Sequence, residues 1–238
     1  MRLRTGTSGF AYPAWKGSFY PEKIRPADML AYYAERFPAV EINNTFYRMP
    51  TEDALRTWAD QVPDDFTFVL KAPQRITHHR RLQEVGEEWS HFTRTAAVLG
   101  SRLGPLLVQL PPNFKCDVQR LHAFLTLLDP AQRVAIEFRH PSWLVTEVFD
   151  VLREHAVALC VAHGEQDAVA PALATAPWGY ARLRNVEYGE AELRGWVERL
   201  REPAWAECFV FFKHEDTATG PRLAAQFARL WAQADAAA

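Results

Sequence analysis

The stretch AVEIN, at residues 39–43, alternates apolar with polar side chains, and this alternation decides the fold. Val40 and Ile42 are typical of a buried β-strand. Glu41 and Asn43 fall between them, at a period of two. Successive side chains of a strand point to opposite faces, so the two polar groups share one face. If helices cover the apolar face, the polar face must line an interior.

Seven further apolar runs of similar length surround this strand in the sequence, and segments with helical spacing separate them. The runs cover residues 3–9, 66–71, 105–110, 133–139, 157–162, 179–184 and 208–213. Strand and helix alternating eight times indicates parallel βαβ units. No GxGxxG follows the first strand, which argues against a doubly wound dinucleotide-binding sheet.

We therefore predict an α/β protein, a single (β/α)8 TIM-type barrel domain over residues 1–238. The sixth crossover is expected to be irregular, because Pro171 and Pro177 leave little room for a helix there.

Composition restricts the class of protein. Apolar residues make up 48% of the 238 residues, which is enough for a large core, and the net charge of −2 does not suit a general nucleic-acid binder. Cys116, Cys160 and Cys208 are scattered, as expected for free thiols in a reducing compartment. The sequence shows neither a signal peptide nor a membrane span. We expect a cytoplasmic protein with no membrane partner, and the sequence does not indicate its oligomeric state.

Because side chains alternate between the two faces of a strand, the position of a residue in this alternation, its strand parity, predicts the face on which it lies. Strand parity places polar side chains on the inward face near the carboxyl ends of five further strands. These residues are Lys71, Gln109, Glu137 with Arg139, Arg182 with Arg184, and Lys213. In barrel enzymes the active site lies at this end. We predict that they form one pocket with Glu41 and Asn43. The alternative is an ion-pair network that closes the barrel mouth and binds nothing, although burying charges is costly.

The charges of this set predict the ligand. Five of the side chains are cationic and two are anionic, in a chain whose net charge is −2. Planar guanidinium groups suit carboxylate and phosphate oxygens. The expected partner is a small anionic, phosphate-bearing ligand or a nucleic-acid component.

Two loops add candidates. The aromatic loop at residues 10–21 contains Tyr12 and Trp15, which could stack on a base or a sugar ring or could simply cap the barrel. His140 follows Arg139 at a strand end, where it could act as an acid or base or could fix the turn before Pro141.

A divalent metal is conceivable at Glu41, Glu137 and His140 together with His214, Glu215 and Asp216. The spacing of these residues matches no common metal motif, and the nearby cations oppose a metal. We therefore assign no residue to a metal site: a divalent metal is possible but not favoured, and the cofactor is unknown.

Seven motifs together resemble the YecE-like family, also called domain of unknown function 72. They are GTSGFAYPAWKGSFYP (6–21), VEINNTFYRMP (40–50), FVLKAPQRITH (68–78), VQLPPNF (108–114), IEFRHPSW (136–143), YARLR (180–184) and VFFKHED (210–216). The resemblance implies a TIM-type barrel without an established activity. Its fold is similar to divalent-metal sugar isomerases and to an endonuclease acting at abasic sites, which is an analogy of fold only.

The resemblance also implies recurrent positions. On this chain they are Glu41, Asn43, Asn44, Lys71, Gln109, Glu137, Arg139, His140, Arg182 and Lys213. The chain departs from relatives at His163, where they often have Asp, and at KHED (213–216), where many have an Asn pair. Both departures weaken the case for a metal.

Three functions follow from these residues. The first is an enzyme acting on a sugar phosphate or a nucleic-acid component. In it Glu41 or Glu137 serves as base and His140 as acid or base, while Lys71 and the arginines hold the anion. The second is a non-catalytic nucleotide-binding or nucleic-acid-binding protein that uses Tyr12, Trp15 and the basic block at 78–81. The third is a divalent-metal-dependent hydrolase or isomerase. The residues alone leave it open whether the protein is an enzyme.

Overall fold

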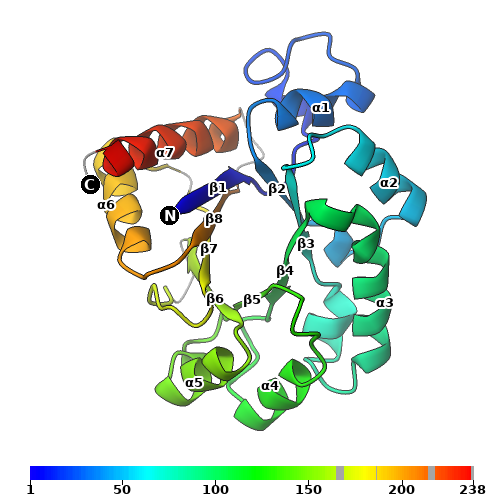
Figure 1. Cartoon of the computed structure of the whole chain (residues 1–238), viewed down its shortest axis with the longest axis vertical. Coiled ribbons are helices and arrows are strands. Elements are labelled where there is room, and N and C mark those ends of the chain that lie inside the picture. The colour runs from blue at the N-terminus through cyan, green and yellow to red at the C-terminus, as the bar shows by residue number, and fades with distance from the viewer. Residues whose placement is uncertain (165–168, 186, 214–217, 237–238) are drawn as a thin grey trace.

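The computed structural model describes residues 1–164, 169–185, 187–213 and 218–236, and they form a ring of parallel strands surrounded by helices (Figure 1). The strands are β1 (Arg2–Thr7), β2 (Ala39–Ile42), β3 (Thr67–Lys71), β4 (Leu103–Gln109), β5 (Val134–Glu137), β6 (Ala158–His163), β7 (Trp178–Leu183) and β8 (Glu207–Phe212). The helices are α1 (Met29–Ala34), α2 (Glu52–Asp60), α3 (Gly86–Ala96), α4 (Val118–Leu125), α5 (Thr146–Glu154), α6 (Glu190–Arg201) and α7 (Thr219–Ala236). The predicted α/β barrel of TIM type is confirmed.

Every strand pairs in parallel with its neighbour, in the order β1-β8-β7-β6-β5-β4-β3-β2. The sixth crossover is irregular as predicted. In its described part, residue 164 and residues 169–177, no helix is formed. The other crossovers bring helices onto the outside of the sheet, which is the arrangement that parallel strands require.

The barrel closes between β1 and β2 through an isolated bridge, Ser8 to Glu41. Earlier along this seam the hydroxyl of Tyr33 lies between the strands. It accepts a hydrogen bond from the Thr7 amide (2.8 Å) and donates one to the Ala39 carbonyl (3.0 Å). Gly6 permits this close approach, because a Cβ there would lie 1.9 Å from the Ala39 oxygen. A side chain of α1 thus replaces backbone pairing at the seam.

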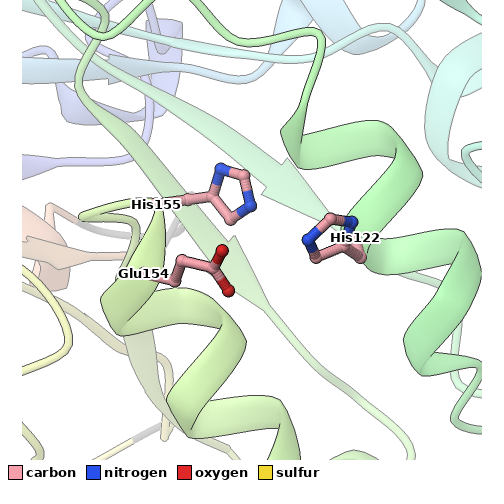
Figure 2. Close-up of side chains that lie close together, drawn as sticks. All are labelled: His122, Glu154 and His155. Carbon is pink, nitrogen blue, oxygen red and sulfur yellow. The ribbon is translucent and has the colours of Figure 1, made fainter.

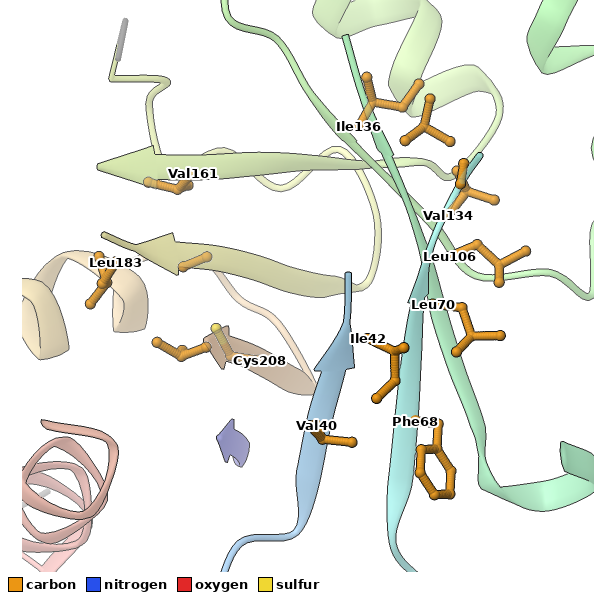
Figure 3. Close-up of a cluster of buried hydrophobic side chains, with 14 of the residues drawn as sticks. Val40, Ile42, Phe68, Leu70, Leu106, Val134, Ile136, Val161, Leu183 and Cys208 are labelled. Carbon is orange, nitrogen blue, oxygen red and sulfur yellow. The ribbon is translucent and has the colours of Figure 1, made fainter. Parts of the chain in front are cut away.

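Strand parity separates two layers of apolar packing. Val40, Leu70, Ile136 and similar residues face the helices in one cluster (Figure 3). The second cluster fills the barrel interior with the residues of opposite parity, among them Val69, Leu107, Ala135, Tyr180 and Phe211. The interior is apolar in its middle, an ion cluster of Arg4, Arg133 and Glu207 lies at the amino ends of the strands, and polar groups line the interior again toward the carboxyl ends.

Cys116, Cys160 and Cys208 are all free, and the last two are buried, as their apolar surroundings predict. None of the described helices combines the length and the apolar character needed to cross a membrane.

Candidate functional site

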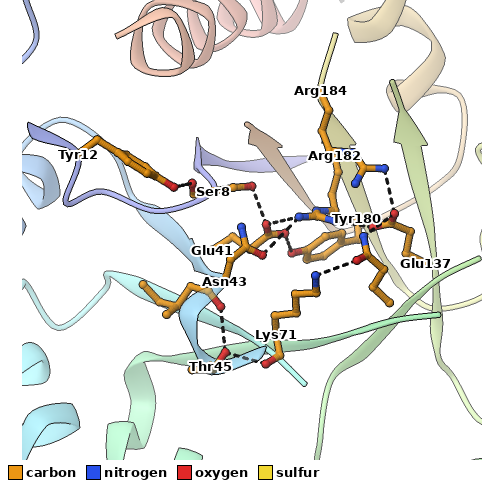
Figure 4. Close-up of polar contacts among 12 residues, drawn as sticks. Ser8, Tyr12, Glu41, Asn43, Thr45, Lys71, Glu137, Tyr180, Arg182 and Arg184 are labelled. Atoms are coloured by element: carbon orange, nitrogen blue, oxygen red, sulfur yellow. Dashed lines mark hydrogen bonds and ion pairs between the residues drawn. The ribbon is translucent and has the colours of Figure 1, made fainter. Parts of the chain in front are cut away.

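A buried ion network occupies the barrel interior near the carboxyl ends of the strands (Figure 4). At its centre Arg182, on β7, donates one hydrogen bond to Glu41 Oε1 (2.8 Å) and one to Glu137 Oε2 (2.6 Å). The side chains of both glutamates are fully buried, and that of Arg182 is 2% exposed. Strand parity brings these groups together from β2, β5 and β7.

Other donors fill the remaining acceptor positions of the two carboxylates. Ser8 donates to Glu41 Oε1 and Tyr180 donates to Glu41 Oε2, each at 2.6 Å. Arg184 and Gln109 donate to Glu137 Oε1, at 3.0 Å and 2.8 Å. Every carboxylate oxygen is thus hydrogen-bonded, as burying these charges requires, whereas the buried Nε of Arg182 has no hydrogen-bond partner among the described residues.

These contacts set the protonation of the two carboxylates. Burial alone would raise the pKa of Glu137, but the charges of Arg182 and Arg184 lower it to about 2. Burial likewise opposes ionisation of Glu41, yet the Arg182 charge and the hydrogen bonds from Ser8 and Tyr180 hold its pKa below the ordinary value. Both glutamates are therefore ionised at neutral pH, and both are weak bases.

Lys71 ends β3 at the edge of this network. Its Nζ donates to Gln109 Oε1 (2.8 Å) and lies 4.1 Å from the centre of the Phe46 ring. Burial and the neighbouring charge of Arg182 lower the pKa of Lys71 to about 8, against the attraction of Glu137 and Glu41. Lys71 therefore titrates close to neutral pH.

Above the network the mouth of the barrel opens into a cavity of about 590 Å³. Its described lining residues are Tyr12, Asn43, Asn44, Phe46, Tyr47, Lys71, Gln74, His78, Gln109, Arg139, Arg182, Arg184 and Lys213. The set contains five basic side chains and no acidic one. Glu41 and Glu137 lie beneath this surface.

The structure brings together most of the predicted ligand-binding residues. Tyr12, Asn43, Asn44, Lys71, Gln109, Arg139, Arg182, Arg184 and Lys213 all line the cavity. The sequence missed Tyr180 and Ser8, although the parity of Arg182 on the same strand places Tyr180 inward. It also missed Phe46, Tyr47 and Gln74, which lie on loops, where parity gives no guidance.

Two candidates are not among the residues that line the cavity, and for Trp15 this corrects the predicted stacking. The Trp15 ring is 0% exposed and packs on Tyr12 and Tyr20, so it cannot stack on a ligand. His140 precedes a short 3-10 turn, and its Nδ1 accepts a hydrogen bond from the Ser142 amide (3.2 Å). The turn-fixing alternative describes His140 better than the acid–base role.

The basic block at 78–81 divides between two environments. His78 lines the cavity, where burial and the charges of Lys71 and Arg139 lower its pKa to about 4 and leave its imidazole neutral. Arg80 instead pairs with Glu88 on α3 (3.3 Å), and Arg81 lies 3.4 Å from Asn113. A nucleic-acid surface built from this block and Trp15 therefore loses most of its support.

No candidate metal site lies at the mouth within the part of the chain that the structure describes. Among the described residues, three side chains lie close enough together to share a metal ion, and they lie away from the mouth, on and just after the outer helices α4 and α5: His122, Glu154 and His155 (Figure 2). The His163 ring packs on Trp196 of α6, outside the barrel. The predicted ligands His214, Glu215 and Asp216 fall outside the described residues.

The fold and the site define a class: a parallel (β/α)8 barrel with a buried carboxylate–arginine network beneath a cationic mouth. The family described as "Protein of unknown function DUF72" matches residues 4–238, and the chain belongs to this family. The predicted membership is confirmed.

Named relatives share part of the chain. It is 31% identical over 133 residues to UPF0759 protein YecE of Escherichia coli (strain K12), which covers 55% of this chain and 48% of YecE. It is 30% identical over 135 residues to UPF0759 protein YunF of Bacillus subtilis (strain 168), over 53% of this chain and 48% of YunF. The matched region spans about half the length of these relatives.

Solved structures agree over nearly the whole chain. A DUF72 family protein of Thermotoga maritima MSB8 superposes with a TM-score of 0.81 at 27% identity, over 97% of this chain and 99% of that one. A DUF72 family protein of Enterococcus faecalis V583 superposes with a TM-score of 0.79 at 20% identity, over 97% of this chain and 95% of that one, and supports the fold alone.

Proposed function

We propose that the barrel mouth binds a small phosphate-bearing ligand. The observation that supports this proposal is the lining of the cavity, where five of the described side chains are basic and none is acidic. Cavities that hold small molecules usually measure about 300 to 1,000 Å³, and this one, at about 590 Å³, falls within that range. Arginine forks suit the paired oxygens of a phosphate.

In this proposal the buried carboxylates position the cations. Glu41 and Glu137 hold the Arg182 guanidinium at the floor, and Glu137 also holds Arg184. Their oxygens are occupied, so neither is well placed to take a proton from a substrate. This assignment differs from the general-base role that the sequence suggested.

Aromatic side chains at the rim suit a ligand with a ring as well as a phosphate. Tyr47 lines the cavity and is 74% exposed, so its ring is accessible to a ligand. Tyr12 and Phe46 line the same cavity. A sugar or base ring could stack on them while the phosphate meets the cations.

Isothermal titration calorimetry tests the proposal with inorganic phosphate, pyrophosphate, a nucleoside monophosphate, a hexose phosphate and the uncharged hexose. We expect the phosphorylated compounds to bind and the uncharged sugar not to bind. Affinity should fall as salt rises, because the contacts are ionic. Arg139→Gln should weaken binding roughly tenfold or more, since a hydrogen bond to a charged group contributes about 1.5 to 3 kcal/mol.

Arg56→Gln is the matched control, because Arg56 lies exposed on α2 and pairs with Glu52 there. It should bind like the unaltered protein. Absence of binding by every phosphate compound, or equal loss in both variants, would overturn the proposal.

A further inference from the structure

Lys71 occupies a setting that an anion-binding role alone does not explain. Its side chain is largely buried, and Nζ has one hydrogen-bond acceptor, Gln109 Oε1, at 2.8 Å. Among the residues that the structure describes, no carboxylate lies within ion-pairing distance of Nζ. The Gln109 amide donates its own hydrogen to Glu137 (2.8 Å), which fixes its oxygen toward Lys71.

The charges around Lys71 are well defined. Arg182 on β7 and Lys213 after β8 repel its ammonium form, while Glu137 on β5 and Glu41 on β2 attract it. Arg139 and His78 line the same cavity. Burial and the neighbouring cations outweigh the two carboxylates and lower the pKa of Lys71 from 10.5 to about 8. At neutral pH the neutral amine is therefore roughly three hundred times more abundant at Lys71 than at a lysine of ordinary pKa.

We propose that Lys71 is a nucleophile that forms an imine with the carbonyl carbon of an aldehyde or ketone whose phosphate the surrounding cations hold. The inference rests on the proposed phosphate binding and adds the substrate class, a carbonyl compound bearing a phosphate. Buried lysines beside other cations are a recurrent solution for this chemistry.

The step balances without an oxidant, a reductant or a second substrate. The Nζ lone pair attacks the carbonyl carbon, a C–N bond forms, and the π electrons of the carbonyl move to its oxygen. The two hydrogens of the neutral amine leave with that oxygen as one water, and a C=N bond remains. Once protonated, the imine withdraws electrons from the adjacent carbon, which eases proton removal or C–C cleavage there.

The cavity has features that suit the step. Gln109 accepts a hydrogen bond from Nζ and so orients its lone pair, and the Phe46 face covers one side. Of the five lysines in the chain, Lys71 and Lys213 line the cavity, and Lys213 is exposed. Lys16, Lys23 and Lys115 lie outside this lining and therefore serve as internal references for nonspecific reaction.

Reductive trapping tests the inference. The protein is incubated with glyceraldehyde 3-phosphate or dihydroxyacetone phosphate and sodium cyanoborohydride, and peptide mass spectrometry locates the adduct. We expect saturable labelling of Lys71, roughly tenfold or more above that of any other lysine, because its neutral form is far more abundant. Labelling should rise with pH up to about 8 and then level off, and inorganic phosphate should compete with it.

Lys71→Arg is the informative variant, because it keeps the positive charge and cannot form an imine. It should lose trapping, and its phosphate affinity is measured separately by calorimetry, whereas Lys23→Arg, at an exposed lysine outside the cavity lining, should change neither trapping nor phosphate binding. Phosphate binding without preferential labelling of Lys71 would overturn the imine and leave the proposed function standing. Absence of phosphate binding would overturn the proposed function itself, and labelling spread evenly over all five lysines would contradict the inference in either case.

Discussion

The two buried glutamates show how single residues carry the site. Glu137 is held by Arg182, Arg184 and Gln109, so its removal would leave Arg182 buried with half of its counter-charge. Breaking one side of a buried ion pair costs about 3 to 5 kcal/mol. We expect Glu137→Gln to lower the free energy of unfolding by about 3 kcal/mol at pH 7, measured by urea denaturation.

The pH dependence of that difference checks its cause. The pKa of the Glu137 carboxyl is about 2 in the folded protein and 4.5 when the side chain is free of these contacts, as in the unfolded chain. Its contribution to the free energy of unfolding is therefore complete above pH 4.5. It should disappear as the pH falls toward 2. The gap between Glu137→Gln and the unaltered protein should therefore narrow over this window, while Glu52→Gln on α2 stays near zero throughout. A gap below about 1 kcal/mol at pH 7 would contradict the role of the network.

Sequence parity predicted these residue positions because a strand allows only two side-chain directions. Glu41, Lys71, Gln109, Glu137 and Arg182 all lie where the alternation placed them. For Trp15 and His140 the sequence left two alternatives open, because both sit on loops, where packing of neighbouring rings and a local cap decide the direction. The structure shows the packed ring for Trp15 and the turn-capping contact for His140.

At the scale of elements, one hydroxyl spans the seam between β1 and β2, beside the Ser8–Glu41 bridge. Tyr33 connects the Thr7 amide to the Ala39 carbonyl, so Tyr33→Phe leaves a buried donor and a buried acceptor unpaired. We expect a loss of about 2 kcal/mol in unfolding free energy and faster amide exchange at Thr7, measured by hydrogen–deuterium exchange.

Tyr32→Phe is the matched control, since Tyr32 lies on the same helix and its ring packs on Arg36. It should change stability little. If the two variants behave alike, the seam is held by packing and not by the hydroxyl. The alternation of strands and helices was readable from the sequence, whereas this closure was not, because it depends on a contact between α1 and two strands.

At the scale of the whole molecule, barrel closure brings charges from five strands, β2, β3, β5, β7 and β8, and the residues that follow them to one mouth. The sequence predicted the sign of this mouth from five cations against two anions. It could not predict that the two anions would lie beneath the surface and the cations above them. That separation depends on the depth of each side chain along its strand, and it turns a mixed set of charges into a cationic cavity.

The central claim is that these cations converge on a cavity that holds an anion of phosphate type. The most direct measurement is the anomalous diffraction of crystals soaked in selenate, a phosphate-sized anion that can be located by its scattering. We expect a peak in the cavity, contacted by Lys71, Arg139 or Arg184, and its loss in the Arg139→Gln variant. A mouth without a peak, or one plugged by apolar side chains while Lys71, Glu137 and Arg182 lie outside the barrel, would contradict the account.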